Sequence, residues 1–211
     1  MGLFGSSIAE GCLESSLGVE LSTSSEVARK YISSPVGEFL AVATSSGLRY
    51  LDLIPCETSN LASGRRTSFF RRNPNRQLGR RHWISCEQKV DSRALEVLEL
   101  LETELRSYFA RTLTAFSIPL DIEAHTSRFK RAVWEAARAI PYGSKVSYAQ
   151  LAETVARPRA ARAVGRALAW NPVLIVIPCH RVVRSNGETG GFVSGARVKE
   201  FLLALESGRQ L

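Results

Sequence analysis

Cys179 and His180 stand side by side in the sequence, and a thiol beside an imidazole is a combination that can carry out nucleophilic chemistry. The imidazole can accept the thiol proton, directly or through a water molecule, and so favour the nucleophilic thiolate. Residues 173–177 are all apolar and predict a buried strand that Pro178 ends, so the cysteine should lie at the mouth of that strand. A lone buried cysteine is more often a small apolar side chain without chemistry, and the adjacent histidine is what favours a reactive one.

Glu206 is the candidate partner for this histidine, because a general base needs an orienting group, which is normally a carboxylate. It closes the segment RVKEFLLALE, in which apolar residues recur at helical spacing, and it falls at the edge of the apolar face. A helix here can therefore direct the carboxylate inward. A surface carboxylate near the C-terminus is the alternative, which would be preferred without the motif at Cys179.

Two short helices are predicted ahead of the cysteine. Ser147 is a candidate N-cap for the first, with Gln150 completing a capping box, and the turn at Pro158 leads into the second. The second helix carries arginines beside small residues on one face, which leaves room for an anionic partner to approach. The pair indicates a helix-turn-helix, although an arginine-rich surface helix is the alternative and periodicity alone does not decide between them.

The composition is that of a globular protein of one or two domains, with 211 residues, 45% hydrophobic and 23% charged. The net charge of +8 suggests a polyanionic partner or only high solubility. Residues 64–81 hold seven arginines and no acidic residue. We interpret the surrounding segment, residues 57–85, as a solvated, flexible loop, a reading compatible with a phosphate-gripping arm. No apolar run reaches the roughly 18 residues that a membrane span needs, so no membrane partner is expected.

The cysteine pattern indicates neither a disulfide framework nor a zinc ribbon. The four cysteines are Cys12, Cys56, Cys86 and Cys179. His82 lies near one of them, but no second pair with ligand spacing accompanies it, so we expect no metal, with a structural zinc in the N-terminal domain as the alternative. The sequence contains no Gly-rich phosphate loop, so we also expect no cofactor. This pattern is typical of a reducing compartment, which would be the cytoplasm, or the nucleus in a eukaryote. Residues 1–26 lack Lys and Arg, unlike a targeting peptide, and are expected to form a poorly ordered tail.

A change in pattern divides the rest of the chain into two predicted domains. Residues 27–119 should form a small α/β domain, in which two or three antiparallel strands precede a helix that is capped by Asp91. Residues 120–211 should be mostly helical and contain both the helix-turn-helix and the cysteine motif.

The second domain resembles the O6-alkylguanine-DNA alkyltransferases, also called methylated-DNA–protein-cysteine methyltransferases. The segments VSYAQLA, RPRAARAVGRAL, NPVLIVIPCHRVV and VKEFLLALE stand in that family's order and at its spacing, and the match covers residues 127–208. The N-terminal half matches only in pattern, through SPVGEFLAVATSSGL. The resemblance implies an RNase H-like first domain, a winged-helix-like second domain, and a monomer whose partner is double-stranded DNA.

The resemblance also implies a reaction. The alkyl group of O6-alkylguanine, and less readily that of O4-alkylthymine, would pass irreversibly to Cys179, so that each molecule acts once. His180 would relay the thiol proton through water while Glu206 holds the imidazole. Tyr148 would donate a hydrogen bond to N3 of the departing guanine, and Asn171 would brace the recognition helix against the active-site loop.

DNA-binding roles follow from the same resemblance. The second helix of the helix-turn-helix would enter the minor groove, and Arg162 would take the place of the nucleotide that is flipped out. Small residues would face this narrow groove while two further arginines reach phosphates. These residues are Ala161, Gly165 and Ala169 for the groove and Arg159 and Arg166 for the phosphates. The base pocket would be lined by Pro178, Val182, Gly191, Phe192, Val193 and Ser194.

Two residues depart from the family pattern. Phe192 stands in place of the usual tyrosine, and Val193 stands where members have serine or arginine, which leaves open the range of alkyl adducts. Two other functions compete with repair. A protein that recognises alkylated bases without reacting would not need Cys179, and a transcription regulator would leave the histidine and the carboxylate without roles.

Overall fold

The computed structural model describes residues 27–54, 91–122 and 126–208. The predictions of a poorly ordered tail over residues 1–26 and of an arginine-rich loop over residues 57–85 lie outside these ranges, as do His82 and every cysteine except Cys179. Those expectations remain predictions.

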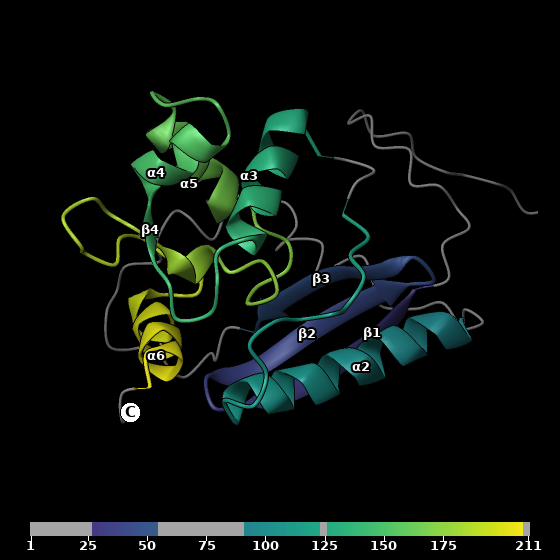
Figure 1. The fold of residues 1–211 in the computed structure, drawn as a ribbon. Coiled ribbons are helices and arrows are strands. Elements are labelled where there is room, and N and C mark those ends of the chain that lie inside the picture. Colours follow the sequence, from purple (N-terminus) through teal and green to yellow (C-terminus); the bar gives the residue numbers. More distant parts are fainter. Residues whose placement is uncertain (1–26, 55–90, 123–125, 209–211) are drawn as a thin grey trace, which may run out of the picture.

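A three-stranded antiparallel sheet forms the first part of the fold, as the sequence predicts (Figure 1). It contains β1 (Ala28–Ser34), β2 (Gly37–Thr44) and β3 (Gly47–Leu53) in that order. Gly47 begins β3 with φ of +146°, and a Cβ there would lie 2.6 Å from the carbonyl oxygen of Pro119. Only glycine allows this close approach, which brings the Pro119 carbonyl within 2.8 Å of the Leu48 amide.

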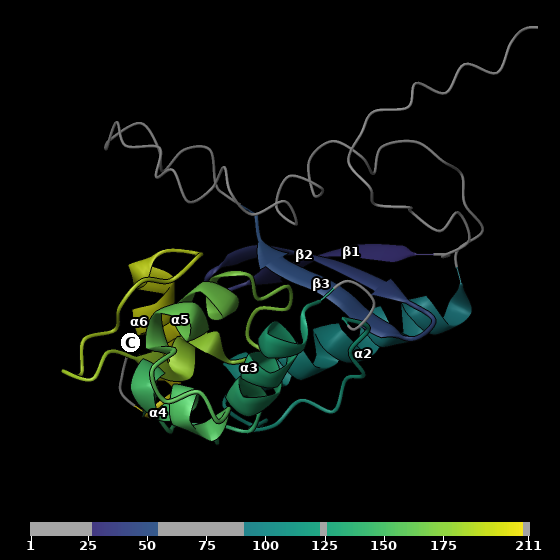
Figure 2. The same ribbon diagram turned by 90° about the horizontal axis from the view of Figure 1, so that it is seen from above.

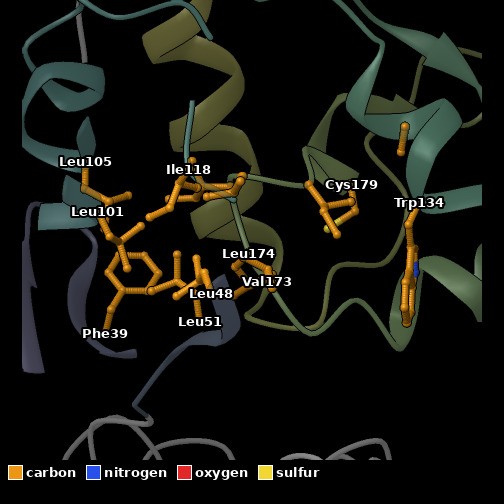
Figure 3. Packing of buried hydrophobic residues seen from close by; sticks show 14 of the residues in the cluster. Phe39, Leu48, Leu51, Leu101, Leu105, Ile118, Trp134, Val173, Leu174 and Cys179 are labelled. Carbon is orange, nitrogen blue, oxygen red and sulfur yellow. The ribbon is translucent and has the colours of Figure 1, made fainter. Parts of the chain in front are cut away.

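The helix α2 (Ser92–Phe109) lies along one face of this sheet (Figures 1 and 2). It starts where the sequence predicts, because the side chain of Asp91 accepts a hydrogen bond from the Arg93 amide at 2.9 Å. Its buried face packs against the inner residues of the strands, and Figure 3 shows Leu101 and Leu105 of α2 beside Phe39 of β2. Burial of this apolar stripe holds the helix in place.

The second half of the chain is mostly helical, as predicted. It contains α3 (Arg128–Arg138), α4 (Tyr148–Thr154), α5 (Ala161–Ala169) and α6 (Ala196–Glu206). The capping box at α4 is confirmed, since Ser147 and Gln150 exchange side-chain and backbone hydrogen bonds. The indole of Trp134 on α3 donates to the carbonyl of Ala167 on α5 at 2.9 Å and ties these two helices together.

The apolar run at residues 173–177 is not the strand that the sequence predicts. It makes isolated bridges, Val173 with Leu51 and Leu174 with Ile177, and the chain reverses between them. Ile175 sits at φ of +69°, a conformation that β-branched residues rarely adopt and that costs about 1–3 kcal/mol. A short apolar run indicates burial but not conformation, which is why the sequence did not distinguish a buried turn from a strand.

Backbone hydrogen bonds join the sheet to this turn. The Leu51 amide of β3 donates to the Pro172 carbonyl at 2.9 Å, and the Leu174 amide donates back to the Leu51 carbonyl at 2.9 Å. The apolar core is continuous across the junction, and Figure 3 shows Leu48 and Leu51 beside Leu174. Within the described ranges, no helix is both long and apolar enough to cross a membrane.

Candidate active site around Cys179

Cys179 opens a short 3-10 helix, η2 (Cys179–Arg181), directly after the buried turn. Its side chain is buried, and its sulfur accepts a hydrogen bond from Nδ2 of Asn171 at 3.2 Å. Burial raises the pKa of the thiol to about 11, although the Asn171 donor and the nearby Lys199 ammonium work in the opposite direction. The thiol is therefore protonated at neutral pH in this structure and needs a base before it can attack.

Asn171 fixes the shape of the turn that carries the cysteine. Besides its contact with the sulfur, its Nδ2 donates to the Ile177 carbonyl at 2.8 Å, and its Oδ1 accepts from the Val173 amide at 3.0 Å. The residue lies just beyond the end of α5, so one amide side chain links this helix to the cysteine turn. The bracing role that the resemblance implies for Asn171 stays a prediction.

His180 and Glu206 form a buried pair behind the cysteine. Nε2 of the imidazole lies 2.7 Å from Oε1 of the carboxylate, and the histidine is fully buried. Because the carboxylate accepts, we assign the proton to Nε2, which leaves Nδ1 as the basic nitrogen. Nδ1 makes no hydrogen bond within the described residues. Burial lowers the pKa of His180 against the opposing effect of Glu206, so the imidazole is neutral and able to accept a proton.

Glu206 does point inward, which decides between the two readings of the sequence. The buried guanidinium of Arg181 donates to both carboxylate oxygens, with Nε 2.9 Å from Oε2 and Nη2 3.0 Å from Oε1. The Gly143 amide and the Tyr108 hydroxyl complete the set of donors. Burial alone would raise the pKa of Glu206, but the hydrogen bonds from His180 and Arg181 outweigh it and lower the pKa to about 2. The carboxylate is therefore ionised and held from several sides.

Tyr148 faces the same site from the start of α4. A Cβ built on Gly165 of α5 or on Gly190 would lie 3.6 Å and 3.4 Å from its ring and hydroxyl, respectively. Burial, followed by the charge interaction with Cys179, raises the pKa of the phenol, so it stays protonated and able to donate a hydrogen bond. The ammonium of Lys199 lies 5.9 Å from the centre of the ring.

The arginines predicted to contact DNA lie on the outer side of α5 and just before it. Arg159, Arg162 and Arg166 are exposed, and none of them pairs with a carboxylate within the part of the chain that the structure describes. The small residues between them are half-buried, namely Ala161, Gly165 and Ala169. The opposite side of α5 is buried against the core. A positively charged face is thus presented to solvent beside the cysteine turn.

The predicted base-pocket residues are less uniform in their surroundings. Pro178 and Val182 are buried beside the cysteine, Gly191 is exposed, and the three residues that follow it are half-buried, namely Phe192, Val193 and Ser194. Among the described residues, no group of His, Cys, Asp or Glu side chains is arranged to hold a metal ion. The expectation of no cofactor remains a prediction.

Three residues of this site received no role from the sequence. Arg181 follows the Cys-His pair directly, and its position beside the motif was the available signal. Lys199 is fully buried and donates to the Val182 carbonyl at 2.6 Å, although a lysine among apolar helix residues reads as exposed. Tyr108 matches the apolar stripe of α2, so its spacing indicated only a core residue.

The family model, the relatives and the solved structure that this chain resembles are all methylguanine-DNA methyltransferases. Residues 128–208 match the family model described as 6-O-methylguanine DNA methyltransferase, DNA binding domain. The methylated-DNA–protein-cysteine methyltransferase of Methanosarcina acetivorans is 34% identical over 173 residues, which span 82% of this chain and 94% of that protein. A protein of the same name from Mycolicibacterium paratuberculosis is 48% identical over 103 residues, which span 49% of this chain and 61% of that protein. The crystal structure of Mycobacterium tuberculosis OGT in complex with DNA aligns with a TM-score of 0.64 at 31% identity, covering 86% of this chain and 93% of that one.

Proposed function

Because this chain belongs to the methylated-DNA–protein-cysteine methyltransferase family, we propose that it repairs DNA by moving the alkyl group of O6-alkylguanine irreversibly onto its own Cys179. The observation that carries the proposal is the arrangement at the cysteine turn. A buried thiol bonded to Asn171 lies beside the neutral His180, and Glu206 holds that imidazole. We also propose that the protein acts as a monomer.

The reaction is a nucleophilic substitution at a saturated carbon. The thiol proton passes through a water molecule to Nδ1 of His180, and the resulting imidazolium is stabilised by the ionised Glu206. The sulfur then attacks the alkyl carbon, so that an S–C bond forms while the bond between that carbon and O6 breaks. The electron pair of the broken bond stays on the guanine, and the departing anion takes up one proton, in net terms the one that the thiol gave to His180, to end as the normal base. The thioether on Cys179 is stable, and each molecule therefore acts once.

Tyr148 assists the departure of the guanine. Its protonated hydroxyl can donate a hydrogen bond to N3 of the base, which offsets the negative charge that develops as the C–O bond breaks. Gly165 and Gly190 both lie near the phenol, since a Cβ built on either of them would lie within 3.6 Å of it.

DNA binding is assigned to α4 and α5, which we take as a helix-turn-helix with α5 as the recognition helix. Its small residues suit the narrow minor groove, and Arg159 and Arg166 can reach the phosphates. The O6 substituent faces the interior of a duplex, so the base must leave the stack at a cost of a few kcal/mol. The exposed Arg162 can fill the vacated space and recover part of that cost. The solved complex of Mycobacterium tuberculosis OGT with DNA supports this partner.

The flipped base would be enclosed by the cysteine turn and by residues 190–194. Pro178 and Val182 are buried and Phe192 is half-buried, and we assign Phe192 as an aromatic wall of this pocket. Val193 offers no side-chain hydroxyl for the alkylated oxygen, so discrimination between methyl and bulkier groups should depend on shape. O4-alkylthymine is proposed as a poorer substrate.

Intact-mass analysis tests the proposed function. The purified protein is mixed with duplex DNA that carries O6-methylguanine, and the modified residue is then located by peptide mapping. We expect each molecule to gain one methyl group in place of one proton, on Cys179. An unchanged mass in the presence of excess lesion, or a methyl group found on another residue, would overturn the proposal.

Arg162→Ala tests base flipping separately from the chemistry. Because the guanidinium fills the space that the extruded nucleotide leaves, we expect repair in duplex DNA to slow by about tenfold, since flipping costs a few kcal/mol and the arginine returns only part of it. Repair of the same lesion in single-stranded DNA should change much less. The measurement is the rate of methyl transfer at saturating DNA, with Arg166→Ala as a control that loses the same charge from the same helix face. Equal slowing on both substrates would exclude the flipping role.

A further inference from the structure

Glu206 receives one hydrogen bond from a distant part of the chain. The hydroxyl of Tyr108, near the end of α2, lies 2.7 Å from Oε1, the same oxygen that accepts from His180. Tyr108 is fully buried, and its ring packs edge-on against Phe109 and Tyr142 with centroid distances of 5.3 Å and 5.9 Å. The phenol is therefore held in one orientation by aromatic packing, and within the described ranges its hydroxyl bonds to Glu206, the partner of His180.

We propose that Tyr108 is a positioning residue, through which the N-terminal sheet-and-helix unit aligns Glu206 and His180 for proton transfer from Cys179. The inference rests on the proposed function and extends it to a residue outside the matched segment of residues 128–208. It assigns to the N-terminal half of the molecule a direct part in the chemistry, beyond packing.

The chemistry of the carboxylate supports this role. An ionised carboxylate has about four lone-pair sites. Here Oε1 accepts from Tyr108, His180 and Nη2 of Arg181, and Oε2 accepts from Nε of Arg181 and from the Gly143 amide, so no site is left open. Each hydrogen bond restricts rotation of the carboxylate. The phenol of Tyr108 donates to Oε1, the oxygen that also accepts from the imidazole. Without the phenol, Oε1 would keep only its donors His180 and Arg181, and the carboxylate could turn and shift the imidazole relative to the sulfur.

The phenol is suited to this task because it remains a donor. Burial, together with the negative charge of Glu206, raises the pKa of Tyr108, so the hydroxyl keeps its proton at any working pH. Among the described residues, the charged groups that act on the imidazole are Glu206 and Lys199, both on α6, and Arg181 of η2. A donor that never loses its proton therefore sets the geometry without altering the charge of the site.

The position of Tyr108 in the fold explains how the N-terminal unit could control alignment. α2 packs on the sheet, and β3 of that sheet is hydrogen-bonded at Leu51 to the turn that precedes Cys179. The same sheet-and-helix unit therefore makes two contacts with the site. Its strand β3 is bonded to the turn before Cys179, and Tyr108 of its helix α2 is bonded to Glu206. The distance between thiol and base is then set by one unit rather than by two independent segments.

Tyr108→Phe tests the inference, with Tyr142→Phe as the matched control. Both changes remove one buried hydroxyl from the same aromatic cluster, but the Tyr142 hydroxyl makes no hydrogen bond within the described residues. At saturating lesion-bearing duplex, we expect the first-order transfer rate to fall by about tenfold in Tyr108→Phe, since general base catalysis contributes 100-fold or more when fully aligned. Tyr142→Phe should transfer at the wild-type rate, and both variants should retain the wild-type affinity for DNA.

A spectroscopic measurement separates positioning from general packing. The Nε2 proton of His180 sits in a 2.7 Å hydrogen bond to a carboxylate, so its NMR resonance should lie far downfield in the free protein. In Tyr108→Phe this resonance should shift or broaden, and in Tyr142→Phe it should not. An unchanged transfer rate in Tyr108→Phe would overturn the inference. A slower rate with an unchanged resonance would also overturn it, since the loss would then come from packing.

The two proposals fail in different ways. If wild-type protein took up no methyl group, the proposed function would be wrong, yet the resonance would still show whether Tyr108 orders the histidine. If the wild type transferred the methyl group to Cys179 and Tyr108→Phe did so equally fast, only the inference about Tyr108 would be wrong.

Discussion

Cys179→Ala should bind DNA that carries O6-methylguanine and leave the lesion intact. The variant lacks the only atom that we expect to form a bond with the alkyl carbon, so no alignment of the remaining groups can replace it. The basic face of α5 is unaffected, because the sulfur is buried and contacts Asn171 rather than the exposed arginines. We expect methyl transfer to fall below detection while the dissociation constant for duplex DNA stays at its wild-type value. Mass analysis of the protein and a filter or anisotropy assay of binding make the two measurements.

The other three cysteines provide the control for this experiment. A variant in which Cys12, Cys56 and Cys86 are all replaced by alanine should still gain one methyl group per molecule. A methyl group found on the Cys179→Ala protein would mean that the acceptor is elsewhere. Loss of DNA binding in the same variant would instead mean that the cysteine turn shapes the recognition surface. A variant that binds DNA without transfer would behave like a protein that recognises alkylated bases but does not react with them. The thiol of Cys179 would then be the feature that distinguishes repair from such recognition.

Glu206→Gln should damage both stability and chemistry. The change leaves the buried guanidinium of Arg181 without its counter-charge, and removal of one partner from a buried ion pair typically costs about 3–5 kcal/mol of unfolding free energy. In a chain of this size that loss should lower Tm by roughly 10 °C. Methyl transfer should fall by on the order of a hundredfold, because His180 loses the carboxylate that orients it and stabilises its protonated form. Urea unfolding and single-turnover transfer at a temperature where both proteins are folded provide the measurements.

The loss of unfolding free energy in Glu206→Gln should depend on pH and should be smaller in acid. The folded protein holds the pKa of Glu206 at about 2, below the ordinary value of 4.5, so the stabilisation from this carboxylate is present above pH 4.5. It decreases as the pH falls from about 4.5 toward 2, where folded and unfolded chains bind the proton alike. The difference in stability between wild type and Glu206→Gln should therefore be largest near pH 7 and should narrow below pH 4.5. Glu102→Gln is the control, because it removes a carboxylate from partly exposed ion pairs on α2, and such pairs contribute little. An equal loss in both variants, or one that does not change with pH, would contradict this account.

The helices were the most predictable part of the fold. Their starts depend on local hydrogen bonds between neighbouring residues, so Asp91 and Ser147 could be identified as caps from the sequence, and both are. The three strands were predictable for a similar reason, because the turns between them are short and rich in glycine and serine. The turn at residues 173–177 was not, because its reversal at Ile175 depends on hydrogen bonds from Asn171 and β3 that local preference opposes.

The candidate chemistry was also visible in the sequence, since Cys179 and His180 are adjacent and the surrounding segments resemble one family in order and spacing. Adjacent residues need no fold to bring them near each other, and their types limit the reactions that they can perform. The sequence thereby determined the class of protein and the main helices, and it identified Cys179 as the candidate acceptor.

Only the tertiary structure decided how the acceptor is held and activated. Glu206 could have faced solvent, and its inward direction follows from its contacts with Arg181, His180 and Tyr108. The last of these residues is 98 positions away along the chain, and its spacing on α2 is that of an ordinary core residue. The raised pKa of Cys179 likewise comes from burial by distant segments. Burial and long-range hydrogen bonds depend on which distant segments come into contact in the folded chain. Local sequence patterns do not show which segments these are.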